Sequence, residues 1–257
     1  MSLHRFFLTA PLAAGAPAAP GEAVALALDG GDAWHLQRVL RLGAGDRFVA
    51  VEPGGREVVV RLAEVGAGLS AVPEEELPRR HEPRVTLVQG VGKGPKTDLV
   101  VEKATEIGAE EVLPVLTART VVRLDARKRA ERGQRWRRVA AEAAKQSQRA
   151  FVPRVEDAVE LGGVLEALRG FDAVLVPWEE AEGRGVRGAL AATASDARVA
   201  VVVGPEGGLT AEEVARLAAV GGVPVTLGRN VLRTETAGIV ALALAIHELG
   251  GLGGRDG

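Results

Sequence analysis

The chain has 257 residues, 47% apolar and 26% charged, which is the composition of a globular protein with one large domain or two ordinary ones. It has no cysteine, which excludes disulfides, a thiolate nucleophile and a cysteine-based metal site. Its four histidines stand singly, which disfavours a histidine-based metal site. The longest apolar stretch, 237–246, falls short of the roughly 20 residues of a membrane helix, and the polar, proline-interrupted first residues do not resemble a secretory signal. We therefore expect a cytoplasmic protein without membrane contact.

Residues 1–75 predict a small β-rich domain. The apolar spacing in 32–43 predicts a short helix that ends at Gly43, and 46–65 predicts two strands joined by the turn at Pro53. The following segment, 73–83, has three prolines and many charges, which is typical of a linker. We therefore place a domain boundary there and assign 76–257 to a second domain.

The second domain alternates strands and helices. Strands are predicted at 84–90, 111–116, 172–178, 197–204 and 224–228, and helices at 97–108, 130–149, 161–170, 210–222 and 234–250. The strand segments are continuously apolar, so both faces of each strand should be buried. This predicts an α/β fold with a mostly parallel sheet between layers of helices.

Positive charge is concentrated in one segment of a chain whose formal net charge is −2. Residues 119–149 hold eleven Lys or Arg against three acids, a local net charge of +8. This segment is either a contact surface for a phosphate backbone or a solvated, arginine-rich helix, and charge alone leaves both open.

The segment 90–97, GVGKGPKT, resembles a phosphate-binding loop of the form G-x-x-x-x-G-K-[ST]. Pro95 stands at the position of the second glycine and has no N–H to offer a phosphate. A nucleotide hydrolase is therefore a minor alternative. We interpret the segment as a loop that leaves Lys93 and Lys96 free to contact a phosphodiester.

The segment 201–213, VVVGPEGGLTAEE, predicts a strand, a glycine-rich loop and a helix. Thr210 and Glu213 have the spacing of a capping box, and Gly207 permits a close approach of backbone to ligand. Glu206 in the middle of the loop would repel a phosphate. A ligand with hydroxyls, ring nitrogens or positive charge fits better, and S-adenosylmethionine has all three. The alternative is a tight structural turn.

The segment 225–249 repeats this arrangement, with Gly228 ending a strand and Thr234 or Thr236 capping a helix. That helix is apolar almost all round, and a terminal helix has few neighbours in its own chain, so we expect it at a subunit interface. Loops at the carboxyl ends of parallel strands meet at one sheet edge, and the segment after 172–178 adds Trp178 and Glu179 there. These loops predict a ligand crevice.

Taken together, the motifs resemble the ribosomal RNA small subunit methyltransferase E family of the SPOUT superfamily. The resemblance rests on HRFFL, HLQRVLRLGAGD, KTDLVVEKATEIGAEEVLPVLTART, RWRRVAAEAAKQSQRAFVPRV, VGPEGGLTAEE and LGRNVLRTETA. It implies an RNA-binding PUA-like β-barrel followed by a methyltransferase domain with a deep trefoil knot, and a homodimer. It also implies methyl transfer from S-adenosylmethionine to N3 of a uridine in 16S rRNA, as free RNA or in the assembled small subunit.

The resemblance also implies roles for individual residues. Arg233 would stabilise the uridine oxyanion and Glu235 would orient Arg233 or take the proton, the alternative being a structural pair at a helix start. The cofactor would contact Val176, Val203, Gly204, Glu206, Gly207, Leu227, Gly228, Val231, Leu232, Thr234 and Ala237. RNA would contact Arg5, Arg38, Arg41, Lys93, Lys96, Arg135, Arg137, Arg138 and Arg149. A non-catalytic RNA-binding protein remains an alternative function.

Overall fold

The computed structural model describes residues 3–12, 21–66, 68–78 and 82–253, which form two compact units. The first unit holds the described residues up to 78 together with Gln148–Phe151, and the second holds the remainder. No helix in these ranges is long and apolar enough to cross a membrane.

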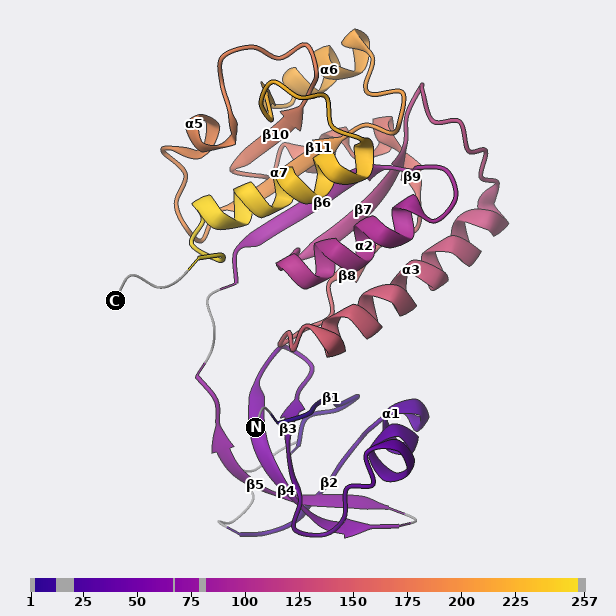
Figure 1. Cartoon of the computed structure of the whole chain (residues 1–257), viewed down its shortest axis with the longest axis vertical. Coiled ribbons are helices and arrows are strands. Elements are labelled where there is room, and N and C mark those ends of the chain that lie inside the picture. The colour runs from indigo at the N-terminus through magenta and orange to yellow at the C-terminus, as the bar shows by residue number, and fades with distance from the viewer. Residues whose placement is uncertain (1–2, 13–20, 67, 79–81, 254–257) are drawn as a thin grey trace. The chain divides into compact units, whose positions relative to one another are not determined.

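The first unit is built on a five-stranded sheet in the order β1-β3-β4-β5-β2 (Figure 1). Its strands are β1 (Arg5–Phe7), β2 (Val24–Ala25), β3 (Arg47–Val51), β4 (Glu57–Val65) and β5 (Leu69–Glu76). The predicted hairpin is confirmed as β3 and β4, which pair in antiparallel register around Gly54 and Gly55, both with positive φ. Phe6, Leu36 and Phe48 lie in the core of this unit.

The prediction of a linker at 73–83 was wrong for its first residues, because strand β5 continues through Pro73 to Glu76. Pro73 lies beyond the two-residue pairing of β5 with β2 and pairs with Val60 of β4 at a register shift, a position where a strand tolerates proline. The charge there is paired across strands, since Glu74 forms ion pairs with Arg47 and Arg61. Residues 79–81 of the predicted linker lie outside the described ranges.

The predicted helix at 32–43 is also shifted. Helix α1 (Gly30–Trp34) begins earlier, because the Asp29 side chain accepts a hydrogen bond from the Asp32 amide at 2.7 Å and caps it. It continues as a π-helical segment, η1 (His35–Val39). The chain then turns at Arg41, whose φ is 53°, so the helix ends before Gly43.

The second unit confirms the predicted parallel α/β sheet, in the order β12-β10-β11-β6-β7-β8 with β9 also paired to β7 (Figure 1). All of its strand pairs are parallel. The strands are β6 (Arg84–Gly90), β7 (Glu111–Leu116), β8 (Arg154–Val155), β9 (Val159–Glu160), β10 (Ala173–Pro177), β11 (Arg198–Val203) and β12 (Gly222–Val225).

Helices cover both faces of this sheet. One face packs against α2 (Lys96–Ile107), α3 (Ala126–Gln146), α5 (Val186–Leu190) and α7 (Thr234–Glu248). The other packs against a 3-10 turn, η2 (Leu161–Gly163), with α4 (Leu165–Leu168) and α6 (Ala211–Ala218). Several details differ from the sequence prediction: 161–170 forms only short turns of helix, and α3 begins at Ala126 because the Asp125 side chain caps it. The predicted helix at 210–222 ends at Ala218, and the strand predicted at 224–228 is β12, which begins at Gly222 and ends at Val225. The short elements β8, β9 and α5 were not predicted.

Helix α7 has more neighbours in its own chain than we expected. Its residues Leu242, Ile246 and Leu249 are buried in the core of the second unit. Leu244 remains 39% exposed, and Ile239 and Val240 are half-buried beside it. The argument that α7 lacks partners within the chain was therefore wrong, and only one side of the helix stays uncovered.

Candidate functional site

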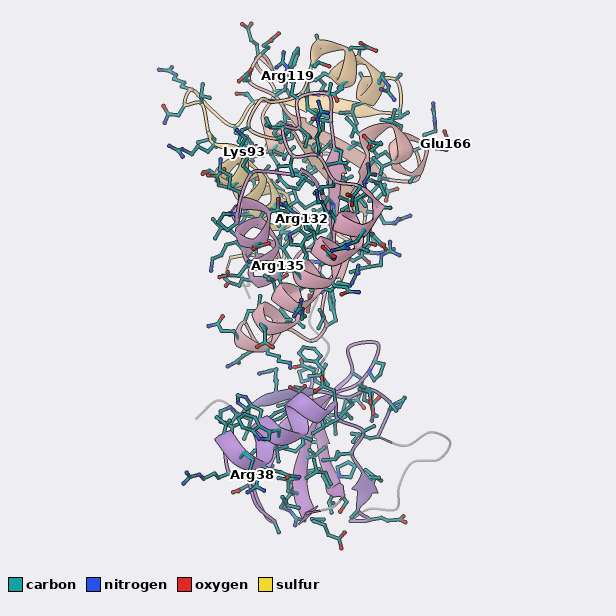
Figure 2. All side chains as sticks on the ribbon, turned by 90° about the vertical axis from the view of Figure 1, so that its right-hand side faces the viewer. Arg38, Lys93, Arg119, Arg132, Arg135 and Glu166 are labelled. Carbon is teal, nitrogen blue, oxygen red and sulfur yellow. The ribbon has the colours of Figure 1, made fainter. Side chains whose placement is uncertain are left out.

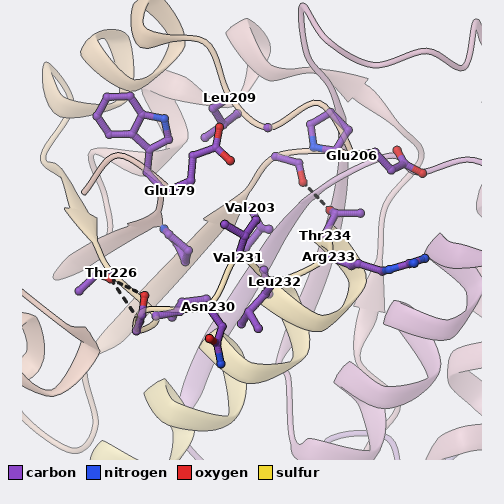
Figure 3. Close-up of a pocket in the computed structure, with 18 of the residues that line it drawn as sticks. Glu179, Val203, Glu206, Leu209, Thr226, Asn230, Val231, Leu232, Arg233 and Thr234 are labelled. Atoms are coloured by element: carbon purple, nitrogen blue, oxygen red, sulfur yellow. Dashed lines mark hydrogen bonds between the residues drawn. The ribbon is translucent and has the colours of Figure 1, made fainter. Parts of the chain in front are cut away.

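A cavity of about 370 Å³ opens at the carboxyl ends of β10, β11 and β12 (Figure 3). Three loops form its wall: Pro177–Glu179, Gly204–Leu209 and Thr226–Arg233. The cavity thus lies where strand-end loops of a parallel sheet converge, as the sequence predicts. It also falls within the usual volume range of small-molecule sites.

The loop after β11 depends on close approaches of its backbone that only glycine permits. A Cβ atom on Gly204 would lie 2.7 Å from the carbonyl carbon of Gly208. A Cβ atom on Gly90, at the end of β6, would lie 2.3 Å from the Pro205 nitrogen. The predicted capping box at the end of this loop is confirmed, since Thr210 and Glu213 exchange side chain to backbone hydrogen bonds of 3.1 and 2.9 Å.

The segment after β7 braces this loop from outside the cavity. Arg119 donates from Nη1 to the Gly207 carbonyl at 2.8 Å, and the Ala118 amide donates to Glu213 Oε1 at 2.8 Å. Arg119 belongs to the basic segment considered above for RNA. In the structure it holds the pocket loop instead.

A buried hydrogen-bond chain joins the loop to β6 and α7. The Thr234 hydroxyl donates to the Gly204 carbonyl at 2.5 Å and accepts from Gln89 Nε2 at 2.9 Å. Thr234 is therefore not a helix cap, and the prediction that Thr234 or Thr236 caps α7 was wrong; the N-cap residue is Arg233, without a side-chain cap. The sequence pattern did not single out Gln89, although a lone amide in an apolar strand was a possible signal.

The acid at the centre of the loop has a structural partner. Glu206 Oε1 accepts a hydrogen bond from the Lys93 amide at 2.9 Å and lies 3.3 Å from the Lys96 ammonium. Lys96 also lies 3.2 Å from Glu235 Oε2, so one ammonium bridges a carboxylate of the pocket loop and one in the first turn of α7. Partial burial raises the pKa of Glu206, but the contacts with Lys93 and Lys96 outweigh it and leave that pKa below its usual value.

These contacts remove the basis for a phosphate site at Gly90–Thr97. The amide of Gly92 donates to the Thr97 hydroxyl at 3.1 Å, and that of Lys93 donates to Glu206. A carboxylate therefore occupies the position that a phosphate would need, which disfavours a nucleotide hydrolase. Lys96 is not free for a phosphodiester as we expected, because it faces two carboxylates; Lys93 is exposed.

Comparisons with known proteins agree with this geometry. A profile described as an RNA methyltransferase domain matches residues 80–246, and one described as an RNA methyltransferase PUA domain matches 28–69. The ribosomal RNA small subunit methyltransferase E of Bacillus subtilis is 35% identical over 88% of this chain and 91% of its own length. This chain belongs to the ribosomal RNA small subunit methyltransferase E family.

Another curated relative and two solved structures also resemble the chain. The Mycobacterium bovis protein is 36% identical over 87% of this chain and 86% of its own length. The Neisseria gonorrhoeae protein, whose crystal structure contains S-adenosylmethionine, matches with a TM-score of 0.72 and 28% identity over 94% of this chain and 96% of that one. A crystal structure described as a hypothetical protein matches with a TM-score of 0.85 and 31% identity over 96% of this chain and 99% of that one.

Most cofactor residues predicted for this methyltransferase E family member line the cavity. They are Val203, Gly204, Glu206, Leu227, Gly228, Val231, Leu232, Thr234 and Ala237. Two predicted residues do not line it: Val176 is fully buried within β10, and Gly207 packs against Arg119. Leu209, Thr226 and Asn230 line it without having been predicted, although each lies within a few residues of a predicted position.

The two predicted catalytic residues do not pair with each other. Arg233 lies at the cavity rim with its side chain extended outward from the start of α7 (Figure 3). Glu235 is largely buried and faces Lys96 rather than Arg233. The structural-pair interpretation therefore does not hold, and Arg233 forms no ion pair with any residue in the described part of the chain.

Apart from Lys96, which faces two carboxylates, the predicted RNA-contacting residues of this family member fall into three groups. Arg5 is buried and paired with Glu57 at 2.7 Å, and Arg149 is buried against the Phe151 ring, so neither is available to a phosphate. On α3, Arg135 pairs with Asp98 at 2.6 Å and Arg137 with Asp157 at 3.0 Å. Exposed positions in the third group are Arg38, Arg41, Lys93 and Arg138. Figure 2 shows Arg135 on α3 and Arg38 directed outward from the first unit.

Proposed function

We propose that this chain transfers a methyl group from S-adenosylmethionine to N3 of a uridine in 16S rRNA of the small ribosomal subunit. Family membership supports the methyl transfer and the class of RNA, and the relative from Neisseria gonorrhoeae holds S-adenosylmethionine. The observation that carries the proposal is the glycine-dependent loop at the carboxyl ends of β10, β11 and β12, whose central acid is paired with Lys96.

The cavity suits adenosine and methionine better than a nucleotide phosphate. Its wall combines apolar side chains, among them Leu227, Leu232 and Ala237, with backbone groups that can read a base and a ribose. Glu179 also lines the cavity and has no ion-pair partner among the residues that the structure describes. A carboxylate there favours a cationic ligand.

Bound S-adenosylmethionine supplies an electrophilic methyl group, and the chain's own residues must prepare the uridine. N3–H is a weak acid, so its loss of a proton leaves negative charge on O2 and O4 that needs stabilisation. Arg233 at the rim can supply that positive charge. Glu235 is the candidate acceptor for the N3 proton, and Lys96 keeps its carboxylate in place.

The proposal extends to assembly and location. The uncovered side of α7, with Ile239, Val240 and Leu244, supports a homodimer in which two copies share this surface. We assign RNA binding to a PUA-like domain at 1–75 and catalysis to 76–257, which carries the cavity. A substrate in the small ribosomal subunit implies action in the cytoplasm.

A methylation assay tests the proposal. The purified protein would be incubated with tritiated S-adenosylmethionine and either naked 16S rRNA or small subunits from a strain that lacks this activity. Mass spectrometry of the digested RNA should show 3-methyluridine at one position. A label on another atom would overturn the N3 assignment. RNA binding without any methyl transfer, under conditions where the protein binds the cofactor, would establish the non-catalytic alternative.

A further inference from the structure

An exposed tryptophan on the first unit has no role in the fold. Trp34, the last residue of α1, is 60% exposed. The other two tryptophans of the chain are engaged: Trp136 is buried and donates from Nε1 to Asp98 at 3.0 Å, and Trp178 lines the cavity. Large aromatic side chains usually bury most of their area, so an indole left in water indicates a contact surface.

The local backbone leaves this indole unscreened. A helical side chain leans over the turn that precedes it, and here that turn holds Gly30 and Gly31. A Cβ atom on Gly30 would meet nothing within 4 Å. Neither glycine has a side chain that could cover the indole, which at 60% exposed is open to a planar ligand.

Positive charge surrounds the indole. Arg38 follows one turn later and extends away from the unit (Figure 2), and Arg41 is also exposed. Val39, which follows Arg38 in the chain, is 49% exposed and adds apolar surface. Within the described ranges no carboxylate lies within ion-pair distance of Arg38 or Arg41. We call Trp34, Arg38, Val39 and Arg41 the Trp34 patch.

The nearby acids that the structure describes have other contacts and form no ion pair with Arg38 or Arg41. Asp29 is engaged with the Asp32 amide, Asp32 itself is buried, and Asp46 accepts a hydrogen bond from the Gly43 amide at 2.8 Å. The Trp34 patch is thus a planar aromatic side chain with two arginines that form no ion pair with any carboxylate in the described part of the chain. Single-stranded nucleic acid is recognised by this combination, because bases stack on aromatic rings while arginines contact the backbone.

We propose that the Trp34 patch binds an unpaired RNA base, with the indole stacked on the base and Arg38 and Arg41 on the flanking phosphates. One indole and one valine offer too little apolar area for a stable protein interface, which needs about 800 Å² from each partner. Duplex RNA presents no free base face, so the patch selects single strands. This inference rests on RNA being the substrate, but not on which atom is methylated.

Binding measurements test the patch without reference to catalysis. A fluorescently labelled, unstructured RNA of about a dozen nucleotides would be titrated against the full chain, with tryptophan emission recorded in parallel. Wild-type emission should fall on binding. Trp34→Phe should keep most of the affinity and lose the quenching, because phenylalanine still stacks. Trp34→Ala should bind about tenfold or more weakly.

Two further variants separate stacking from charge and from general effects. Arg38→Gln should lower the slope of log affinity against log salt by about one. Leu99→Ala, which shortens another exposed apolar side chain, 41% exposed on α2 of the second unit, should leave binding unchanged. Circular dichroism would confirm that each variant is folded.

The inference is overturned if Trp34→Ala binds single-stranded RNA as tightly as wild type, or if duplex RNA quenches emission to the same extent. Loss of binding in Trp34→Ala, together with methylation at an atom other than N3, would leave the inference standing and remove only the proposed reaction. Normal methylation of uridine N3, with no quenching of Trp34 emission by RNA, would leave the proposed reaction standing and remove the inference about the Trp34 patch.

Discussion

Removing the Thr234 hydroxyl should loosen the pocket from inside. Thr234→Val keeps the side-chain shape but removes the hydrogen bonds to the Gly204 carbonyl at 2.5 Å and from Gln89 Nε2 at 2.9 Å. Gln89 Nε2 keeps a contact to the Gly90 carbonyl at 3.2 Å, so the main loss falls on Gly204. A buried polar group left without its partner costs about 1–3 kcal/mol.

This free energy should appear in two measurements. The free energy of unfolding, from urea titration followed by circular dichroism, should fall by about 1–3 kcal/mol. Calorimetry with S-adenosylmethionine should show weaker binding, because Gly204 and Thr234 both line the cavity. If part of the binding free energy is used to re-order the loop in Thr234→Val, each 1.4 kcal/mol used in this way raises the Kd for S-adenosylmethionine about tenfold.

Thr236→Val is the matched control, since Thr236 is exposed on the same helix two residues on. It should change stability by no more than about 0.5 kcal/mol and leave Kd unchanged. If Thr234→Val and Thr236→Val behave alike in both measurements, the hydrogen-bond chain does not hold the pocket, and the reasoning from Gln89 to Gly204 fails.

Four further outcomes are expected. Arg233→Ala should bind the cofactor normally and lose methylation rate by about 10²–10³ in single-turnover assays, the scale for one oxyanion-stabilising group; full activity would remove it from the mechanism. Glu206→Gln should remove part of the stability that wild type loses on acidification, because the lowered pKa of Glu206 makes its own contribution present at neutral pH and lost as pH falls through that pKa. Unfolding midpoints measured across the acid range check this, and an unchanged pH dependence contradicts it. Leu244→Asp should give monomers in sedimentation, whereas an unchanged sedimentation coefficient would place the interface elsewhere. Arg132→Glu with Arg138→Glu, two exposed or half-buried positions on α3, should flatten the salt dependence of rRNA binding, and an unaltered slope would make α3 a solvated helix.

Features set by neighbouring residues were predictable from the sequence. The strands at 84–90 and 111–116 have the predicted bounds because continuous β-branched and leucine runs select a buried strand. The capping box at Thr210 and Glu213 was equally readable, since both partners lie within one helical turn. The glycine-rich loops likewise indicated where the cavity would form.

Features that depend on distant residues were not predictable in this way. In the sequence, Lys96 stands at the position of the lysine in a phosphate-binding loop. Only the fold brings Glu206 and Glu235 next to it. Arg5 looked like a surface cation until Glu57, from another strand, was seen to neutralise it. The knotted path of the chain is a matter of threading rather than of local pattern, and it stays a prediction.

The pocket depends on contacts between residues that are far apart in the chain. The hydrogen bond from Gln89 to Thr234 spans 145 positions, and that from Thr234 to Gly204 spans 30. Such closures carry a large entropic cost and form after local structure during folding. A ligand that needs the finished pocket stabilises interactions absent from the folding transition state, so it slows unfolding and leaves the folding rate unchanged. Cofactor binding therefore lengthens the lifetime of the folded protein without hastening its formation.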